Sequence, residues 1–303
     1  MNSLVSAIIT THNRLDNLKK AINSVLNQTY KNIEIIVVDD ASSDGTYEYC
    51  SKIKQIKYLR IEKDDSKGGN YARNLGIQNA KGDYIAFLDD DDEWLKEKTE
   101  KQVTYLNTHD CEIVYCNRII DVNNGALKYT ENSKNKLSGD CSKLIFYNII
   151  GTTSTYMFKR EIILNNQFDE KVKFWQEYDL ITRIAQQTKI GYIDEPLIIY
   201  RQNINEKKKL TNNVSGWFEN LTYLNNKYSS FISNLNTEEN KKRQIMIYRD
   251  LVTRYSNLGD KKNKKKYLFK IYKCTHSLKD FIKYLLNLDR ITYMKWRLKI
   301  LKK

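Results

Sequence analysis

The chain has 303 residues, of which 41% are hydrophobic and 12% aromatic, so it can build one large or two modest cores and is not a disordered protein. No run of about 18 apolar residues predicts a membrane span, and the apolar start at Leu4–Ile9 is too short for a signal peptide. The five cysteines form no CxxC pair of the zinc or redox type. We therefore expect a cytoplasmic protein with reduced thiols.

The first two thirds of the sequence alternate strand and helix patterns, which favours an α/β fold with crossover helices. A strand over Val5–Thr10 precedes a helix with apolar residues at helical spacing from Leu15 to Leu26, which Asn13 is expected to cap. The next elements in chain order are a strand at Ile33–Val38, a weaker strand at Ile56–Ile61, a helix at 70–80 and a strand at Tyr84–Leu88.

The alternation continues beyond Trp94, although the polar stretch 121–140 reads as a loop or hairpin. The elements predicted there are a helix to about Asn107, strands at Ile113–Cys116, Thr155–Phe158 and Leu197–Tyr200, and a helix at Glu177–Gln187. From residue 205 onwards the pattern is wholly helical. The sequence thus predicts a mixed, mostly parallel sheet with flanking helices in a domain of residues 1–204, followed by a smaller α-helical region of residues 205–303.

Two acidic clusters follow predicted buried strands. Asp39 and Asp40 end one strand, and the run Asp89–Asp92 ends another. Either cluster alone is typical of a solvated loop, but the carboxyl ends of parallel strands meet at one edge of a sheet, where ligands bind. Repulsion between the carboxylates is relieved by a cation, and a hard divalent ion prefers such oxygen ligands.

Four motifs in order resemble family 2 glycosyltransferases of the GT-A fold, a Rossmann-like nucleotide-diphospho-sugar transferase fold. They are VSAIITTHNR at 5–14, VVDDASSDGT at 37–46, GNYARNLG at 69–76 and GDYIAFLDDDDEW at 82–94. The resemblance covers roughly residues 3–201.

The resemblance implies a nucleotide-sugar site that uses Mn²⁺ or Mg²⁺. Asp39 would accept a hydrogen bond from N3 of uracil, and Asp91 would ligate the metal while Asp89 faces the ribose or the metal shell. The residues implied to bind the nucleotide are Thr11, Arg14, Asp39, Arg73, Asp89 and Asp90. For Arg73, a surface arginine on a helix is the alternative.

The resemblance also implies a catalytic base in the segment FWQEYDLITR at 174–183. Glu177 stands where relatives carry an aspartate and is our candidate base. Asp179 is the rival, with an alternative structural role as a cap or as a partner of Arg183. Trp175 is expected either to stack on a sugar or to lie in the core.

Two further segments depart from the family pattern or leave alternatives open. Many relatives carry a histidine near Asn203, so Asn203 or Arg201 is expected to contact the diphosphate instead. The stretch Gly151–Thr155 either lines the donor-sugar or acceptor side or forms an ordinary turn.

Positive charge is concentrated in the last third of the chain. Residues 1–204 hold 27 Lys and Arg against 29 Asp and Glu, whereas residues 205–303 hold 24 against 8. The basic runs at 261–266 and 293–303, interleaved with aromatic and leucine residues, favour an anionic membrane surface as partner, at the inner face of the plasma membrane. A solvated lysine face is the alternative, and no nucleic-acid motif accompanies the charge.

The leading functional hypothesis is an inverting glycosyltransferase of the hexosyltransferase type. It would use a UDP-sugar to extend a glycan or lipid-linked acceptor of capsule, teichoic acid or lipopolysaccharide. A nucleotide-dependent oxidoreductase is disfavoured because the first turn, TTHNR, is not glycine-rich. The remaining alternative is a non-catalytic membrane or nucleic-acid binding module with a degenerate transferase domain, against which the intact Asp89–Asp92 run argues.

Overall fold

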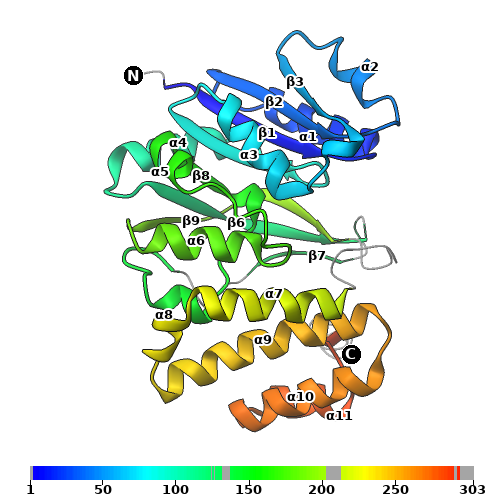
Figure 1. The fold of residues 1–303 in the computed structure, drawn as a ribbon, viewed down its shortest axis with the longest axis vertical. Helices are drawn as coiled ribbons and strands as arrows, with labels where there is room; N and C mark the ends of the chain where they lie inside the picture. Colours follow the sequence, from blue (N-terminus) through cyan, green and yellow to red (C-terminus); the bar gives the residue numbers. More distant parts are fainter. Residues whose placement is uncertain are drawn as a thin grey trace. The chain divides into compact units, whose positions relative to one another are not determined.

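The computed structural model describes residues 3–123, 125, 127–131, 137–202, 213–289 and 292–293. Contacts divide the chain into two units (Figure 1). The first comprises Met1–Ile145 and Ile150–Asn203, and the second Phe146–Ile149 and Ile204–Lys303. The predicted domain boundary between residues 204 and 205 lies outside the described residues, as do Asn203 and the basic run from residue 294 onwards.

The first unit is built on one mixed sheet, most of whose described strands are labelled in Figure 1. They are β1 (Val5–Thr11), β2 (Ile33–Asp40), β3 (Ile56–Ile61), β4 (Tyr84–Asp89), β5 (Glu93–Trp94), β6 (Ile113–Val122), β7 (Leu127–Thr130), β8 (Tyr156–Lys159) and β9 (Ile190–Gln202). Their spatial order is β3-β2-β1-β4-β8-β6-β9-β5, with β7 beside β6. The strands β3, β2, β1 and β4 are parallel, whereas β8 runs antiparallel to both β4 and β6. The predicted mixed α/β sheet is confirmed.

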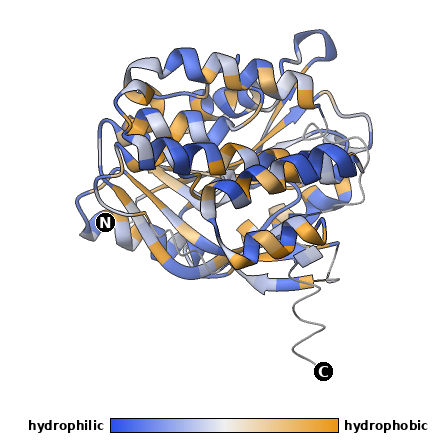
Figure 2. Ribbon diagram, turned by 90° about the horizontal axis from the view of Figure 1, so that it is seen from below, coloured by the Kyte–Doolittle hydropathy of each residue, from blue (hydrophilic) through white to orange (hydrophobic). Residues whose placement is uncertain are grey.

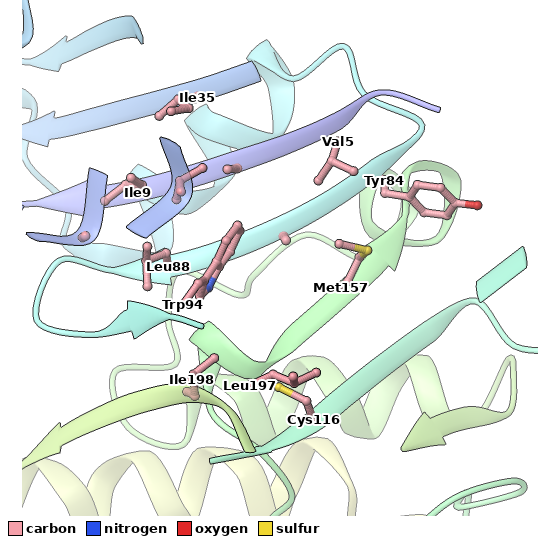
Figure 3. Packing of buried hydrophobic residues seen from close by; sticks show 14 of the residues in the cluster. Val5, Ile9, Ile35, Tyr84, Leu88, Trp94, Cys116, Met157, Leu197 and Ile198 are labelled. Carbon is pink, nitrogen blue, oxygen red and sulfur yellow. The ribbon is translucent and has the colours of Figure 1, made fainter. Parts of the chain in front are cut away.

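Helices cover both faces of this sheet. They are α1 (Leu15–Leu26), α2 (Thr46–Cys50), α3 (Gly69–Asn79), α4 (Lys98–Thr108), α5 (Arg160–Asn165) and α6 (Gln176–Ala185). Apolar side chains of α1 and α4 pack with one alternating set from β1 and β4, and Figure 3 shows members of this core such as Val5, Ile9 and Leu88. On the opposite face α3 approaches closely, because a Cβ atom at Gly76 would lie 2.5 Å from Cγ2 of Ile8.

Three sequence-based expectations need correction. Asn13 does not cap α1, since the cap position is Arg14 and carries no side-chain cap bond; the first helical amide, that of Leu15, instead donates to Asp44 Oδ2 at 2.8 Å. The strands β6 and β9 are longer than predicted and pair along their length. The two-residue strand β5 was not predicted, because its pattern is too short to register.

The second unit is helical in all of its described elements outside Phe146–Ile149, as predicted. Its helices are α7 (Val214–Lys227), α8 (Ser229–Ser233), α9 (Thr237–Asn257), α10 (Lys261–Thr275) and α11 (Leu278–Leu285). Side chains of Asn236, Asp260 and Ser277 accept bonds from the first amides of α9, α10 and α11, as helix caps do. None of the helices in the described residues is long and apolar enough to cross a bilayer, and Figure 2 shows hydrophilic and hydrophobic residues mixed along them.

Candidate active site

The ends of β1, β2 and β4 meet at one edge of the sheet. Thr11 pairs with Asp39 across β1 and β2, and Thr10 pairs with Asp89 across β1 and β4. The two acidic clusters therefore flank the end of β1, as the sequence predicts. The hydroxyl of Thr11 donates to Asp90 Oδ2 at 2.8 Å, which joins the first motif to the acidic run.

The loops after β1 and β2 are tied to each other. The amide of Asn13 donates to the hydroxyl of Ser42 at 2.8 Å, and Asn13 Oδ1 accepts from the amide of Ser43 at 2.8 Å. Both loops contain a non-glycine residue at positive φ, Asn13 at 51° and Ala41 at 60°. Asn13 thus fixes a turn beside the site rather than a helix end.

Asp39 is fully buried and its carboxylate is already bonded inside the protein. Oδ1 accepts from the amide of Ser42 at 3.0 Å, and Oδ2 accepts from the hydroxyl of Tyr58 at 2.5 Å and from Arg60 Nη1 at 3.5 Å. Burial and the bond to this carboxylate both raise the pKa of Tyr58, so the phenol stays a donor. The neighbouring Asp40 differs, because its buried Oδ1 has no hydrogen-bond partner.

Sequence reasoning gave no separate role to Asp40. The one feature of the sequence that could have indicated a role for Asp40 is its place in the same motif, one residue after Asp39. Tyr58 and Arg60, which occupy Oδ2 of Asp39, come from β3, which the motif does not include, so the difference between the two aspartates could not be seen in the sequence.

The four aspartates of the acidic run have different environments. Asp90 is buried and receives Arg14 Nη1 at 3.1 Å; burial raises the pKa of Asp90 to about 6, with Arg14 opposing the rise and Asp91 adding to it. Asp91 has a side chain 38% exposed, 3.4 Å from the same arginine. Asp92 is buried, accepting from the Ser154 hydroxyl at 2.6 Å, and its pKa is raised well above the usual range by burial and by neighbouring aspartates.

Arg73 links the acidic run to helix α6. Its Nη2 donates to Asp89 Oδ1 at 2.8 Å, and its Nη1 donates to Gln176 Oε1 at 3.1 Å. Burial pulls the pKa of Arg73 down, but Asp89 and Glu177 raise it more, so the guanidinium remains charged. A surface arginine is excluded, because only 8% of the residue is exposed.

The two candidate bases on α6 have different contacts. Glu177 Oε1 accepts a short bond from the hydroxyl of Thr153, in the turn Thr153–Thr155 whose Ser154 also reaches Asp92. Asp179 is 1% exposed, and its Oδ2 receives Arg183 Nε at 3.2 Å. The turn therefore joins Glu177 to the acidic run, while Asp179 is bonded to its own helix.

Arg201 and Trp175 are two further candidates for contact with the ligand. Arg201 pairs with Glu93 at 2.6 Å, and its amide donates to Asp92 Oδ1 at 3.0 Å, so it lies at the acidic run. Trp175 takes a left-handed conformation just before α6 and packs on Tyr178, with ring centroids 5.3 Å apart.

The donor set fits a hard divalent ion that shares its coordination with a substrate. Among the described residues, no three His, Cys, Asp or Glu side chains gather as a metal site of their own. Mg²⁺ commonly uses one or two carboxylates together with substrate phosphates. The half-exposed carboxylate of Asp91 and the neighbouring Asp89, 27% exposed, suit that role.

Comparison with known proteins points to one family. The model of a family described as glycosyl transferase family 2 matches residues 6–168. The chain is 36% identical over 197 residues to an uncharacterized glycosyltransferase of Rickettsia felis, covering 64% of this chain and 32% of that protein. It is 42% identical over 118 residues to WfaP of Escherichia coli, a UDP-Glc:alpha-D-GlcNAc-diphosphoundecaprenol beta-1,3-glucosyltransferase, covering 39% and 47%. The chain thus spans less than half the length of these relatives.

Solved structures show the same fold at low sequence identity. TarS 1-349 of S. aureus in complex with UDP-GlcNAc has a TM-score of 0.62 at 18% identity, covering 89% of this chain and 81% of that one. The mannosyltransferase PcManGT from Pyrobaculum calidifontis in complex with GDP-Man and Mn²⁺ has a TM-score of 0.60 at 16% identity, covering 94% and 88%. The likeness confirms the predicted GT-A type of fold.

Proposed function

Since the chain belongs to glycosyl transferase family 2, we propose that it transfers a sugar, with inversion, from a UDP-sugar to a hydroxyl of a glycan or lipid-linked acceptor in cell-surface polysaccharide synthesis. One observation carries the proposal: β1, β2 and β4 end level, so that two acidic clusters meet beside Arg14 and Arg73. The name of WfaP, which describes transfer of glucose from UDP-Glc to a lipid-linked acceptor, supports the same class of reaction.

The base of the nucleotide would bind at the end of β2. An acceptor is needed for the N3–H of uracil, and a carboxylate provides it. The bonded oxygens of Asp39 hold that aspartate in place, whereas the buried Oδ1 of Asp40 lacks a hydrogen-bond partner that a ligand donor would supply. The role predicted for Asp39 would thus be shared by the two aspartates: Asp39 stabilises the wall of the pocket, and Asp40 accepts the hydrogen bond from the base.

Asp91, with Asp89, would hold the divalent ion against the diphosphate. A bound Mn²⁺ or Mg²⁺ supplies charge that stabilises the departing diphosphate. On the protein side, Arg14 and Arg73 stay cationic beside these carboxylates and balance part of their charge before the substrate binds.

Glu177 is the proposed general base. As the acceptor hydroxyl attacks the anomeric carbon, a Glu177 oxygen accepts the hydroxyl proton, and attack opposite the leaving diphosphate inverts the configuration. The bond from Thr153 is made to Oε1 and holds the side chain in position. The other carboxylate oxygen, Oε2, would then accept the proton. Asp179 keeps its ion pair with Arg183 and is the alternative base.

Nucleotide binding tests the proposal most directly. Thermal unfolding of the full chain is followed with UDP, with and without MnCl₂. Ligand that binds only the folded state raises its stability, by about 2.7 kcal/mol at 100 times Kd. We expect UDP with Mn²⁺ to raise Tm, Asp91→Ala to lose the metal-dependent part and Asp40→Asn to weaken UDP binding.

Asp110→Ala is the matched control, because the Asp110 side chain is 92% exposed and pairs with Lys189 away from the acidic run. It should keep the full response. If no nucleotide and metal combination stabilises the wild-type chain, the proposed transferase is wrong and the non-catalytic module is favoured. If the wild-type chain does bind nucleotide, a panel of nucleotide-sugars tested for hydrolysis identifies the donor.

We also propose that the helical unit holds the protein at an anionic membrane surface on the cytoplasmic side. Exposed apolar side chains gather on α10 and α11: Phe269 is 37%, Leu278 73%, Leu285 54% and Leu286 49% exposed. Exposed lysines lie on the same two helices: Lys261, Lys262, Lys265, Lys266, Lys273 and Lys279. Leucines among lysines suit an interface with anionic lipid.

The acidic residues of this segment do not oppose such binding. Asp260 accepts from the amide of Asn263 as a helix cap, Asp280 is 6% exposed and Asp289 accepts from the hydroxyl of Ser256 at 2.6 Å. The exposed charge of α10 and α11 is therefore basic.

Vesicle co-sedimentation tests this second proposal. The full chain should sediment with phosphatidylglycerol vesicles, less so at high salt, and not with phosphatidylcholine vesicles. Leu278→Glu and Leu285→Glu together should reduce binding, whereas Leu26→Glu, at a residue 39% exposed in the first unit, should not. Equal binding by the double variant, or preference for duplex DNA over the vesicles, contradicts the proposal.

A further inference from the structure

A further cation, Arg118 on β6, lies at the same edge of the sheet as the acidic run. β6 and β4 both run antiparallel to β8, so they point the same way. Ala86 of β4 and Val114 of β6 both pair with Met157. Arg118 lies four residues beyond Val114, towards the edge that carries Asp89–Asp92, and the charge of Asp92 acts on it.

An irregularity in β6 lies directly before Arg118. The register with β9 shifts on both sides of Asn117, and Asn117 Oδ1 accepts from the amide of Arg118 at 2.8 Å. Such bulges re-aim a side chain and are frequent beside active sites. The strand therefore breaks its regular pairing at the residue before Arg118.

The guanidinium of Arg118 has two contacts in the protein and one nitrogen without a partner. Its Nε donates to Glu131 Oε2 at 2.7 Å, and its central carbon lies 4.8 Å from the ring centroid of Tyr200. Its Nη1 is buried without a hydrogen-bond partner, and 15% of the side chain is exposed. A buried donor without a partner is costly, and a ligand acceptor would satisfy it.

The surroundings keep this group charged and connect it to the acidic run. Burial pulls the pKa of Arg118 down, but Glu131, Tyr200 and Asp92 together raise it. Tyr200 is followed by Arg201, whose amide bonds to Asp92 at 3.0 Å. The cation is thus a fixed part of the same edge.

We propose that Arg118 binds an acidic group of the acceptor, a phosphate or a carboxylate, through its guanidinium, whose buried Nη1 has no hydrogen-bond partner in the protein. The strand order places β1 and β2, with the nucleotide residues, on one side of β4 and places β6 on the other. Arg14 and Arg73 are bonded to Asp89–Asp91 on the donor side. The subsite rests on the proposed transferase function, since it assigns which acceptors the enzyme prefers.

Ligand-observed NMR tests the subsite by measuring the binding of small probes to the full chain saturated with UDP and Mg²⁺, with no Mn²⁺ present. The probes are methyl β-D-glucuronide for the carboxylate, sn-glycerol 3-phosphate for the phosphate and methyl β-D-glucoside as the neutral comparison. Wild type should bind one or both acidic probes about tenfold more tightly than the glucoside, the effect of one charge-assisted hydrogen bond. Arg118→Gln should lose this preference, and Arg118→Lys should keep part of it.

Two further variants separate binding from a structural role. Glu131→Gln removes the competing carboxylate, so it should tighten binding of the acidic probes. Arg160→Gln, an exposed arginine whose Nη2 donates to the carbonyl of Ala80, should change nothing. If Glu131→Gln weakens acidic probes as much as Arg118→Gln does, Arg118 is only a structural partner and the inference is wrong.

The outcome for wild type also separates this inference from the proposed function. Binding of UDP without any preference for the acidic probes overturns the Arg118 subsite alone. Failure to bind UDP overturns the transferase proposal itself. If Arg118→Gln has a strongly lowered Tm, the charge-preserving Arg118→Lys variant decides the test: a folded Arg118→Lys variant that keeps part of the preference for the acidic probes supports the subsite, and one that keeps none overturns it.

Discussion

At the scale of single residues, the two acidic side chains of α6 are expected to respond differently to substitution: one change should lower activity and the other should lower stability. Glu177→Gln removes the proton acceptor while keeping the size of the side chain and its contact with Thr153. We expect turnover to fall by about 10²-fold to 10⁴-fold, the usual contribution of a general base. The Kd for UDP should stay within about twofold, because the proton transfer does not involve the nucleotide. Steady-state kinetics and UDP titration measure the two effects.

Asp179→Asn is the paired control for that prediction. The buried carboxylate of Asp179 holds Arg183, whose Nη2 also donates to the carbonyl of Gln167 at 2.7 Å. Breaking this buried pair should lower the free energy of unfolding by a few kcal/mol, with a smaller effect on turnover per folded molecule. A fully active Glu177→Gln variant together with an inactive but stable Asp179→Asn variant would transfer the role of base to Asp179.

The sequence was informative for residues that lie in recognisable motifs and silent for those that meet across strands. Thr11, Arg14 and the Asp89–Asp92 run were predicted to lie together, because they follow strands whose ends converge, and the contacts of Thr11 and Arg14 with Asp90 confirm this. The occupation of Asp39 by Tyr58 could not be predicted, since the hydroxyl reaches it from a strand 19 residues away along the chain. No local pattern records such a contact.

At the scale of elements, prediction succeeded where hydrophobic periodicity is long. The helix α1 and the strand β2 have the predicted cores, whereas β6 and β9 extend into polar residues that carry no strand pattern of their own. They extend because each provides the other with a hydrogen-bonding partner. Tertiary pairing of this kind is not visible in either segment alone.

Helix α4 begins at a buried lysine, which predicts an unusual pH dependence of stability. Lys98 is 0% exposed; its Nζ donates to Gln102 Oε1 at 2.6 Å and lies 4.1 Å from the ring centroid of Trp94. Burial lowers the pKa of Lys98 to about 8, with the Cys116 thiol opposing the fall. The charged ammonium is therefore destabilising in the folded state below that pH.

The sign of the effect follows from proton linkage. Between pH 8 and about 10.4, the ordinary pKa of lysine, the unfolded chain binds more protons at Lys98 than the folded chain does. Stability from this group therefore rises with pH in that window and is constant below it. Lys98→Met removes the titration, so wild type should gain on the order of 3 kcal/mol relative to the variant between pH 8 and pH 10.4.

Urea unfolding of wild type and Lys98→Met at several pH values measures the difference, and groups common to both chains cancel. Lys101→Met is the control on the same helix. Bonds to Glu195 and Glu97 raise the pKa of Lys101. The stability that its charged form contributes should therefore fall, and not rise, as the pH passes through that raised pKa. A wild-type and Lys98→Met difference that stays constant from pH 7 to pH 10 would exclude a lowered pKa at Lys98.

At the scale of the whole molecule, the chain enters its helical unit twice. The segment Phe146–Ile149 belongs to that unit although the residues on both sides of it belong to the first. Phe146 is 1% exposed, stacks on Phe231 with centroids 5.2 Å apart and offers its carbonyl to Arg243. A domain boundary drawn from the change in charge near residue 204 does not reveal this, because the four residues 146–149 are uncharged.

Phe146→Ala should therefore destabilise the helical unit selectively, by about 3–5 kcal/mol, the usual cost of removing a buried phenylalanine side chain. In calorimetry we expect an early transition for the weakened unit and a later one that UDP with Mn²⁺ still shifts, because the nucleotide residues lie in the first unit. Phe269→Ala, at a residue 37% exposed, should leave the profile nearly unchanged. A single transition that UDP shifts as a whole in the Phe146→Ala variant would show instead that the two units unfold cooperatively, so that Phe146 stabilises the entire chain.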